Sequence, residues 1–548
     1  MIIKKKSILE TIMGSTLFRW SIYPILFIIV MTFTSPVTWN IIPNNIPNLN
    51  YLFLQTYPDS ARYMLSTIVQ SEAAIFALIV SLSLVAVQLS ASSFSSRIIE
   101  IFKKSPDVWT LILIYIFLII YGVAILKLIE PNEEIISDFE YYISLDYRLG
   151  VFAFLALIPY IWNILDLLKP SNIIDKLSEK ITKERILSID RFGDKNDAIQ
   201  PITDIIISSL MRYDESTVIY GLNAIGSKLE LIFTEFDKCD VCNVSIVFRH
   251  LSIIGELAVE KRDAYATVHA IVTIGQIGML ATEEMLEEVS LQSILSIGEI
   301  GTRSNRQNME YVSIWAVNLL GKIGVLATNK MFQNNCALQA ILFTKDIGAT
   351  AAETSRKVSI KHATSSIRSI GMEGSKRRQK DTVLIAVSEL EKLGVISIES
   401  GLENEAIAAA ESLEAITIIA IENNLESEAV FAAHAIGNLG TIAAKKEFKE
   451  MISNILLYLK KIGENSIDRR SEKTASIAII GLGSVGIASA KQKLCKATDQ
   501  SISQIKFLQI LAKENKLDDI SSLGEKSINN IYSSIDFKKD DINIESGI

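Results

Sequence analysis

The pattern of apolar and polar positions along this 548-residue chain changes near residue 170. Before that point the chain carries four long apolar windows, each close to the roughly 20 residues that cross a ~30 Å hydrocarbon layer. These windows are residues 20–39, 63–90, 108–128 and 149–168. After residue 170, no period-two alternation persists long enough to predict a sheet. The pattern therefore predicts an all-α protein that begins with a four-helix transmembrane domain over 1–170.

The rest of the chain repeats a short phrase, in which an aliphatic residue precedes Gly-x-aliphatic-Gly and Ala or Ser follows three positions later. Its clearest copies are 274–281, 297–304, 320–327 and 436–443, and the interval that recurs is 23 residues. Two such intervals are similar in length to the two-helix unit of HEAT and armadillo repeats, in which stacked neighbours supply the core. We therefore expect a helical connector and first cap over 171–217, a HEAT-like α-solenoid over 218–535, and a flexible tail over 536–548.

The second apolar window is more polar than a lipid-facing helix should be, because polar side chains in hydrocarbon are costly unless they face protein or water. Steps of 3.6 residues from Gln70 follow small and amide side chains nearly to its end, so we expect one face to line a hydrated path. The residues expected to line it are Gln70, Glu72, Ala77, Ser81, Gln88, Ser92 and Ser95. The alternative is that small and polar residues only permit tight packing and hydrogen bonding within the bundle. The sequence leaves both interpretations open.

Basic residues gather before the first window, between the second and third, and after the fourth, whereas the other two loops are mainly acidic. The positive-inside rule then predicts a multi-pass protein of the cell membrane with both termini, and the α-solenoid, in the cytoplasm. The acidic loop before the fourth window would lie outside and enrich cations near the mouth of a path. The residues expected to do so are Glu130, Glu133, Glu134 and Asp138.

The end of the second window resembles a known sequence family. The run Leu84-Val85-Ala86-Val87-Gln88-Leu89-Ser90-Ala91-Ser92-Ser93-Phe94-Ser95-Ser96-Arg97, preceded by Ser66-Thr67-Ile68, is similar to the signature helix of a family of uncharacterised prokaryotic predicted membrane proteins. Ser96 stands where that pattern leads us to expect proline. The resemblance covers roughly the first 170 residues and implies a membrane domain of unknown function, so it transfers no chemistry. The likeness of the downstream array to HEAT repeats is one of architecture rather than activity.

Two motifs in the array look like binding sites but have simpler explanations, a repeat helix for the first and a reduced cysteine pair in a loop for the second. The run Gly481-Leu482-Gly483-Ser484-Val485-Gly486 matches a dinucleotide fingerprint, but it falls 46 residues after Gly437, in register with the other repeats. Cys239 and Cys242 have half the spacing of a zinc site and no second close cysteine pair, so we expect no metal centre.

A basic cluster follows Gly374 in an expected inter-helix turn. Its residues are Lys376, Arg377, Arg378 and Lys380. We consider it a candidate site for an anionic small ligand, because the concave faces of solenoids often bind ligands. The alternative is a solvated turn with no ligand.

Composition excludes several classes of function. The chain has a formal net charge of −8 and no sustained basic stripe, so nucleic acid is not an expected partner. No Ser-His-Asp arrangement, P-loop or paired-carboxylate motif stands out, so we expect neither enzyme activity nor a cofactor. The remaining expected partners are the lipid bilayer, further copies of the chain, and a cytosolic protein or small ligand on the solenoid.

Two hypotheses of function follow. In the first, the protein is a homo-oligomeric channel, selective for cations, whose second spans line the path and whose solenoids regulate it. In the second, the membrane domain is only an anchor, and the solenoid is a scaffold that recruits a cytosolic protein. The size of the repeat array motivates the second hypothesis, because it holds more than half of the chain.

Overall fold

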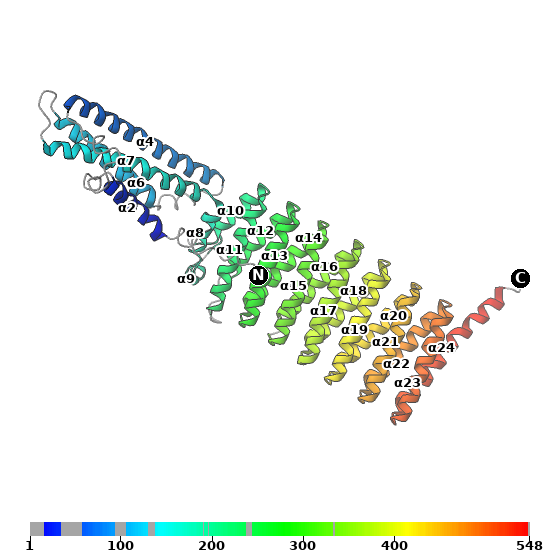
Figure 1. Cartoon of the computed structure of the whole chain (residues 1–548). Coiled ribbons are helices and arrows are strands. Elements are labelled where there is room, and N and C mark those ends of the chain that lie inside the picture. Colours follow the sequence, from blue (N-terminus) through cyan, green and yellow to red (C-terminus); the bar gives the residue numbers. More distant parts are fainter. Residues whose placement is uncertain are drawn as a thin grey trace, which may run out of the picture. The chain divides into compact units, whose positions relative to one another are not determined.

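The structure is a computed structural model that describes residues 16–33, 57–93, 106–129, 137–189, 191–194, 197–236, 244–332 and 335–545. Within these ranges every regular element is a helix, which confirms the expected all-α fold. The chain divides into two compact units, Met1–Lys176 and Leu177–Ile548 (Figure 1). We call them the membrane unit and the array.

Four long helices form the membrane unit. They are α2 (Thr16–Phe33), α4 (Pro58–Ser93), α6 (Pro106–Leu128) and α7 (Ser137–Leu167). Helix α4 packs against α6 and α7, while α2 packs against α7. Figure 1 shows α4 along one edge of this bundle.

The exposed surface of this unit is apolar. Three segments are long and apolar enough to cross a membrane: residues 58–89, 108–128 and 140–166. Within the apolar 18-residue stretch of each segment, only 17%, 28% and 33% is buried, respectively. Three array helices are also long and apolar enough to span a membrane, but 56% to 61% of their apolar stretches is buried inside the protein. Apolar residues that no protein covers require lipid in their place. The membrane unit is therefore built to lie in a bilayer.

Two expected windows differ from the helices that contain them. The first window was expected over 20–39, and its residues after Phe33 lie outside the described part of the chain. The fourth was expected to begin at 149, but α7 begins at Ser137. Hydropathy marks only the apolar portion of a helix, so it misses turns that carry polar residues such as Asp146. Much of the expected acidic loop is therefore helix.

Sixteen helices of the array lie in the described ranges after the short α8 (Pro170–Ser178), which crosses the boundary between the units. In order they are α9 (Lys183–Leu187), α10 (Gln200–Met211), α11 (Glu215–Thr234), α12 (Val244–Glu260), α13 (Ala264–Glu283), α14 (Glu287–Arg306), α15 (Glu310–Asn329), α16 (Asn335–Glu353), α17 (Lys357–Arg377), α18 (Lys380–Glu399), α19 (Glu403–Glu422), α20 (Glu426–Lys445), α21 (Lys449–Asp468), α22 (Glu472–Lys491), α23 (Cys495–Glu514) and α24 (Asp518–Glu545). From α18 to α24, each helix starts 23 residues after the previous one. One helix is thus one repeat.

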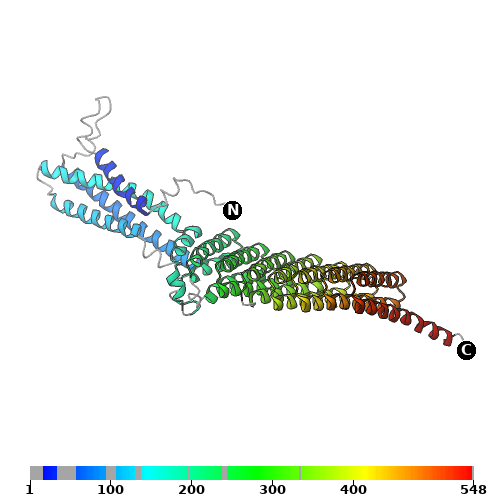
Figure 2. The ribbon, with the colours of Figure 1, turned by 90° about the horizontal axis from the view of Figure 1, so that it is seen from below.

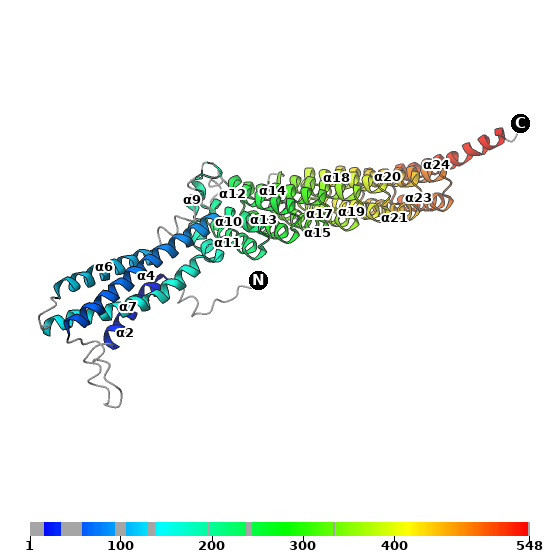
Figure 3. The same cartoon turned by 90° about the horizontal axis from the view of Figure 1, so that it is seen from above.

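The array has two layers, because from α12 to α22 each helix packs both on its successor and on the helix after that. Seen from above, α17, α19, α21 and α23 lie in one row, and α18, α20 and α24 lie in the other (Figure 3). The same two rows are visible from below in Figure 2. Stacked helices of this kind bury a continuous core that no single repeat could form.

From α12 to α24, the described turns between successive helices share one hydrogen-bond pattern. One residue adopts positive φ, such as Met285 at 64° and Asn308 at 64°. The N–H of the following residue reaches back to a small residue near the helix end, as Leu286 does to the Ala281 carbonyl at 2.8 Å. This is the Schellman arrangement, which ends a helix and reverses the chain in a fixed geometry. Its repetition every 23 residues keeps successive helices in register.

The glycines of the repeated phrase lie where helices approach most closely. A Cβ added at Gly278 would lie 1.9 Å from the Ser293 Oγ, and one added at Gly298 would lie 2.3 Å from the Phe343 ring. The Gly481 backbone itself is 3.1 Å from a Cβ built on Gly437. The glycine run that resembles a dinucleotide fingerprint therefore lies within α22, at the place where α22 crosses α20.

The last helix extends into the segment that was expected to be a tail. The sequence predicts a tail over 536–548, but α24 continues to Glu545. No glycine or proline interrupts residues 536–545. The helix therefore has no local reason to stop earlier.

Candidate functional site in the membrane unit

Helix α4 presents two different faces. One face is buried against α6 and α7, and its residues recur at the spacing of a helix stripe. These buried residues are Ala61, Leu65, Glu72, Ile79 and Ala86. The opposite face is exposed along the length of the helix, so α4 is a peripheral helix whose outer side no described residue covers.

Four of the seven expected path-lining residues lie on the exposed face. They are Gln70, Ala77, Ser81 and Gln88. Ser92 belongs to α4, but its side chain lies outside the described part of the chain, as does all of Ser95. Next to this polar stripe, Leu78, Val85 and Leu89 are also exposed, at 67%, 53% and 55%. The exposed face of α4 is thus half polar and half suited to lipid.

Glu72 does not belong to this stripe. It is completely buried, on the side of α4 that packs against α6 and α7. Each residue advances about 100° around a helix, so a residue two positions after Gln70 points to nearly the opposite side. We therefore correct the expectation that Glu72 lines a shared path.

The structure brings Glu72 close to Asp146 of α7. Both side chains have 0% exposure, and no hydrogen-bond partner is described for any of their four carboxylate oxygens. The two groups lie near enough to interact electrostatically. Within the described residues, neither carboxylate forms an ion pair with Lys, Arg or His. The pair is therefore two buried carboxyl groups inside the spans, with no described partner that would stabilise their charged form.

Two glycines make room for these carboxylates. A Cβ on Gly150 of α7 would lie 3.5 Å from Glu72 Oε1. A Cβ on Gly122 of α6 would lie 3.2 Å from Asp146 Oδ1 and 2.5 Å from the Val69 side chain. Any larger residue at position 122 would therefore collide with α4 and narrow the space around Asp146.

Tyrosines of α6 line the same region. Tyr115 is fully buried, donates its hydroxyl to the Ala153 carbonyl at 2.8 Å, and interacts electrostatically with Glu72. Tyr121 interacts with Asp146 in the same way, and no hydrogen-bond partner is described for its buried hydroxyl oxygen. The carboxylate pair thus faces neutral oxygens rather than cations.

Hydroxyl groups elsewhere on α4 are satisfied locally. Thr67 and Ser71 donate to backbone carbonyls one turn earlier, at 2.8 and 2.7 Å. Ser83, on the packed side, donates to the Ile79 carbonyl at 2.7 Å and shares a 2.5 Å hydrogen bond with Tyr160 of α7. Ser83 therefore follows the packing interpretation, in which a polar residue links two helices of the bundle.

The expected outer acidic loop is only partly described. Glu130, Glu133 and Glu134 lie outside the described residues. Asp138 lies in the first turn of α7 rather than in a loop, and its side chain is not described. Among these four residues, only Asp138 can be placed on a helix.

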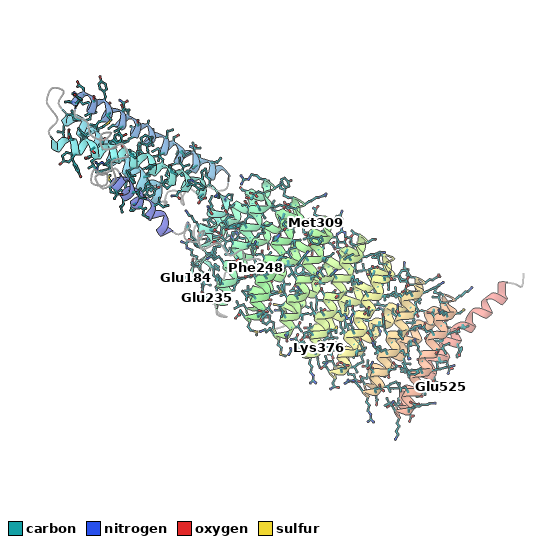
Figure 4. The ribbon with its side chains drawn as sticks, viewed as in Figure 1. Glu184, Glu235, Phe248, Met309, Lys376 and Glu525 are labelled. Carbon is teal, nitrogen blue, oxygen red and sulfur yellow. The ribbon has the colours of Figure 1, made fainter. Side chains whose placement is uncertain are left out.

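The basic cluster of the array lies at the turn between α17 and α18. Lys376 is seen at the helix ends in Figure 4. The Arg377 Nε lies 3.1 Å from Glu373 Oε1 and the Lys376 Nζ lies 3.8 Å from Glu373 Oε2, while Arg377 also contacts Asn329. Arg378 adopts positive φ at the turn, and Lys380 begins α18. Part of the cluster is therefore neutralised within the protein.

A buried contact between an aspartate and a histidine near the start of the array was not anticipated from the sequence. His250 Nε2 lies 2.8 Å from Asp197 Oδ2, both side chains have 0% exposure, and His250 Nδ1 lies 3.2 Å from Thr203 Oγ1. Burial tends to raise the pKa of Asp197, but His250 and the N–H groups of Gly193 and Gln200 hold it below its ordinary value. Complete burial gives this pair a structural role, because a substrate cannot reach it.

A local signal for this pair does exist in the sequence. Asp197 lies three residues before Gln200, where α10 begins, and accepts hydrogen bonds from the Ile199 and Gln200 N–H groups, both at 3.1 Å. An Asp side chain often accepts from the backbone N–H two residues on, as in an Asx turn, so an Asp shortly before a helix start is a recognisable local signal. Phe248, labelled in Figure 4, is buried two residues before His250 on α12. The pairing of Asp197 with His250 cannot be predicted from local sequence pattern, because 53 residues separate the two.

Cysteines and histidines form no described metal site. Cys336 is buried and Cys495 is exposed, and Cys239 and Cys242 lie outside the described residues. No group of three or more His, Cys, Asp or Glu side chains in the described ranges is placed to hold a metal ion.

Comparison with known proteins supports the membrane unit alone. A family model described as "Predicted membrane protein (DUF2254)" matches residues 14–205, which confirms the resemblance seen in the sequence. No curated protein matches the chain. One solved structure, a "Circular tandem repeat protein with novel repeat topology and enhanced subunit contact surfaces", is 12% identical, with a TM-score of 0.39 over 69% of this chain and 98% of that one. At that score the likeness carries no argument. The protein is thus a membrane protein with a helical-repeat array.

Proposed function

We propose that this protein is a homo-oligomeric, cation-conducting channel of the cell membrane, in which the exposed face of α4 lines the path and the array regulates it. The observation that carries the proposal is the stripe of Gln70, Ala77, Ser81 and Gln88 on the uncovered side of a spanning helix. The matched family supports a membrane protein and says nothing of conduction.

The energetic argument concerns the two amides. A side-chain amide that loses water without a new hydrogen bond costs on the order of 2–7 kcal/mol, depending on the reference state. Gln70 and Gln88 are exposed on a helix whose neighbouring residues are lipid-facing aliphatics, and the one hydrogen bond described for either amide runs from Gln70 Nε2 to Ser66 Oγ at 3.3 Å. An arrangement that gives both amides water avoids this cost, and a path shared by several copies of the chain supplies that water.

Symmetry explains why the path would be shared. Identical subunits usually assemble around a closed rotation axis. Because α4 buries one face against α6 and α7 and leaves the opposite face exposed in the described ranges, that exposed face can be turned toward such an axis. Leu78, Val85 and Leu89 would then face lipid or the next subunit. The positive-inside rule would put both termini and the array in the cytoplasm, where a ligand or partner could act on the path.

The test is ion conduction by purified protein in planar bilayers. Ser81→Leu and Gln88→Leu should each reduce the conductance several-fold, because they replace polar groups on the stripe. Val85→Leu is the matched control: Val85 is exposed on the same helix, outside the stripe, and its substitution should leave conductance unchanged. No current at any voltage, or equal losses in all three variants, would contradict the proposal.

A second candidate function is a membrane-anchored scaffold, and an aromatic surface on the array favours it. The ring centroids of Tyr265 and His269 on α13 lie 4.8 Å apart, and those of Tyr311 and Trp315 on α15 lie 6.4 Å apart. Three of these side chains are exposed by 37% to 61%. Exposed aromatic residues on neighbouring helices of one layer are typical of protein-binding surfaces. A monomer in detergent that conducts no ions would favour this function over the channel.

A further inference from the structure

The Glu72–Asp146 pair carries an inference that does not depend on conduction. Two carboxylates are completely buried between α4, α6 and α7, and within the described residues neither has a hydrogen-bond partner or a basic side chain paired with it. Removing an ion from water costs several kcal/mol even after the protein relaxes, and like charges placed together add to that cost. An arrangement of this kind is stable only if a positive charge joins it, either a bound cation or a proton on one of the carboxyl groups.

The nearest basic residue on α7 does not supply that charge. Arg148 lies two positions after Asp146, about 200° around the helix, and no described ion pair joins it to Asp146 or Glu72. Its Nε is itself among the buried atoms with no described hydrogen-bond partner. The positive charge therefore has to come from outside the described side chains.

The surroundings of the pair suit a cation with a preference for oxygen. The four carboxylate oxygens and the Tyr121 hydroxyl oxygen are all buried without a described partner. Hard cations such as Ca²⁺ and Mg²⁺ are bound by carboxylate, hydroxyl, carbonyl and water oxygens. Gly150 and Gly122 keep side-chain carbon away from the carboxylates on two sides, where a Cβ would come within 3.5 and 3.2 Å of them.

We propose that Glu72 and Asp146 form an intramembrane binding site for a hard, oxygen-preferring inorganic cation, which joins α4 to α7 across Gly122 of α6. The site lies on the face of α4 opposite the polar stripe, so it stands whether or not that stripe lines a path. The bound cation neutralises the pair and holds the three helices together. Its loss leaves two repelling carboxylates at the contact between α4 and α7.

The proposal predicts that cations stabilise the protein through this site. The full chain, purified in detergent with choline as the only other cation, is titrated at fixed pH and ionic strength with Na⁺, K⁺, Mg²⁺ or Ca²⁺ chloride. At least one of these salts should raise the unfolding midpoint by several degrees, because a ligand that binds only the folded state stabilises it. Comparison of the four titrations identifies which cation binds.

Three variants assign the effect to the site. Glu72→Gln and Asp146→Asn keep the shape of the side chain and remove its charge, and each should abolish the cation-dependent shift. Asp59→Asn is the matched control, because Asp59 is an exposed carboxylate in the first turn of the same helix. The shift should persist in this control. A shift that survives in both site variants would overturn the proposal.

A second measurement needs no variant and covers the case in which a site variant does not fold. A hydrophobic carbodiimide reacts with carboxyl groups inside membrane spans, and mass spectrometry locates the adduct. In the wild-type protein, the cation that raises the midpoint should reduce labelling of Glu72 about tenfold, whereas choline should not. Labelling that depends on pH alone and ignores all four cations would show a proton site and refute the cation site.

Discussion

A single methyl group at Gly278 tests the packing on which the array depends. This glycine lies in the phrase Ile274-Gly275-Gln276-Ile277-Gly278, on the side of α13 that meets α14. A Cβ there would lie 1.9 Å from the Ser293 Oγ, 2.7 Å from the Ser293 Cβ and 3.0 Å from Ile323 Cδ1. Rotation of Ser293 relieves the first contact but not the second. Gly278→Ala therefore has to push α13 and α14 apart.

The size of the effect follows from these distances. Carbon atoms in contact prefer about 3.5–4.0 Å, so the two helices have to separate by roughly 1 Å at this point. Overpacking of a buried site typically costs about 1–3 kcal/mol, and approaches of 1.9 and 2.7 Å put this site in the upper part of that range, at about 2–3 kcal/mol. Alanine regains up to ~1 kcal/mol of helix propensity over glycine. The expected net loss of stability for Gly278→Ala is therefore about 1–2 kcal/mol.

Cys336 offers a local probe of this loss. Its side chain has 0% exposure on α16, the helix that packs on α14, and burial raises the pKa of its thiol to about 12. The thiol therefore reacts with a maleimide only when this part of the array opens. With Cys239, Cys242 and Cys495 replaced by serine, the labelling rate of Cys336 reports the free energy of opening. Gly278→Ala should increase that rate about 5- to 30-fold.

Gly524 provides the matched control. It is also a buried glycine in an array helix, but a Cβ there would lie 3.4 Å from the nearest atom, an ordinary contact. Gly524→Ala should leave the Cys336 rate unchanged and raise the urea midpoint of the 222 nm helix signal slightly, because only helix propensity changes. If the labelling rate of Cys336 in the Gly278→Ala variant is no higher than in the wild type, the close approach of α13 and α14 is not present in the protein.

Three further predictions concern the array. Asp197→Asn should destabilise the protein by about 1–3 kcal/mol at pH 7, because it weakens a buried hydrogen bond to a charged carboxylate. The pKa of Asp197 in the folded protein lies below its ordinary 3.8, so the stability that this residue contributes is present above pH 3.8 and is lost as the pH falls through the folded pKa. The urea midpoints of the wild type and the variant should therefore converge in acid. Gly401→Ala should cost about 1 kcal/mol in a thermal melt, because φ is +77° and no atom lies within 4 Å of the added Cβ; a neutral result would contradict backbone strain as the cause. Residues 177–548 expressed alone should be soluble with a strongly helical circular dichroism spectrum, and a β-rich spectrum would refute the repeat fold.

Much of the architecture could be predicted from local features of the sequence. Apolar windows of spanning length mark α4, α6 and α7, because hydropathy is a property of consecutive residues. The repeated glycines mark the array, because each lies at the same position of a 23-residue repeat and faces the same kind of contact. The exposed side of α4 was also predictable, since a 3.6-residue period assigns residues to faces.

The sequence alone determined that this protein is helical throughout its described ranges, with a spanning portion followed by stacked repeats. Only the tertiary structure decided which faces of those helices meet. Glu72 and Asp146 are 74 positions apart, and Asp197 and His250 are 53 apart, so their pairing depends on how α4, α7 and α12 are rotated against their neighbours. That rotation is set by packing contacts summed over whole helices, such as those of Gly122 with Val69. Periodicity places a residue on a face of its own helix, but it does not specify which helix that face contacts.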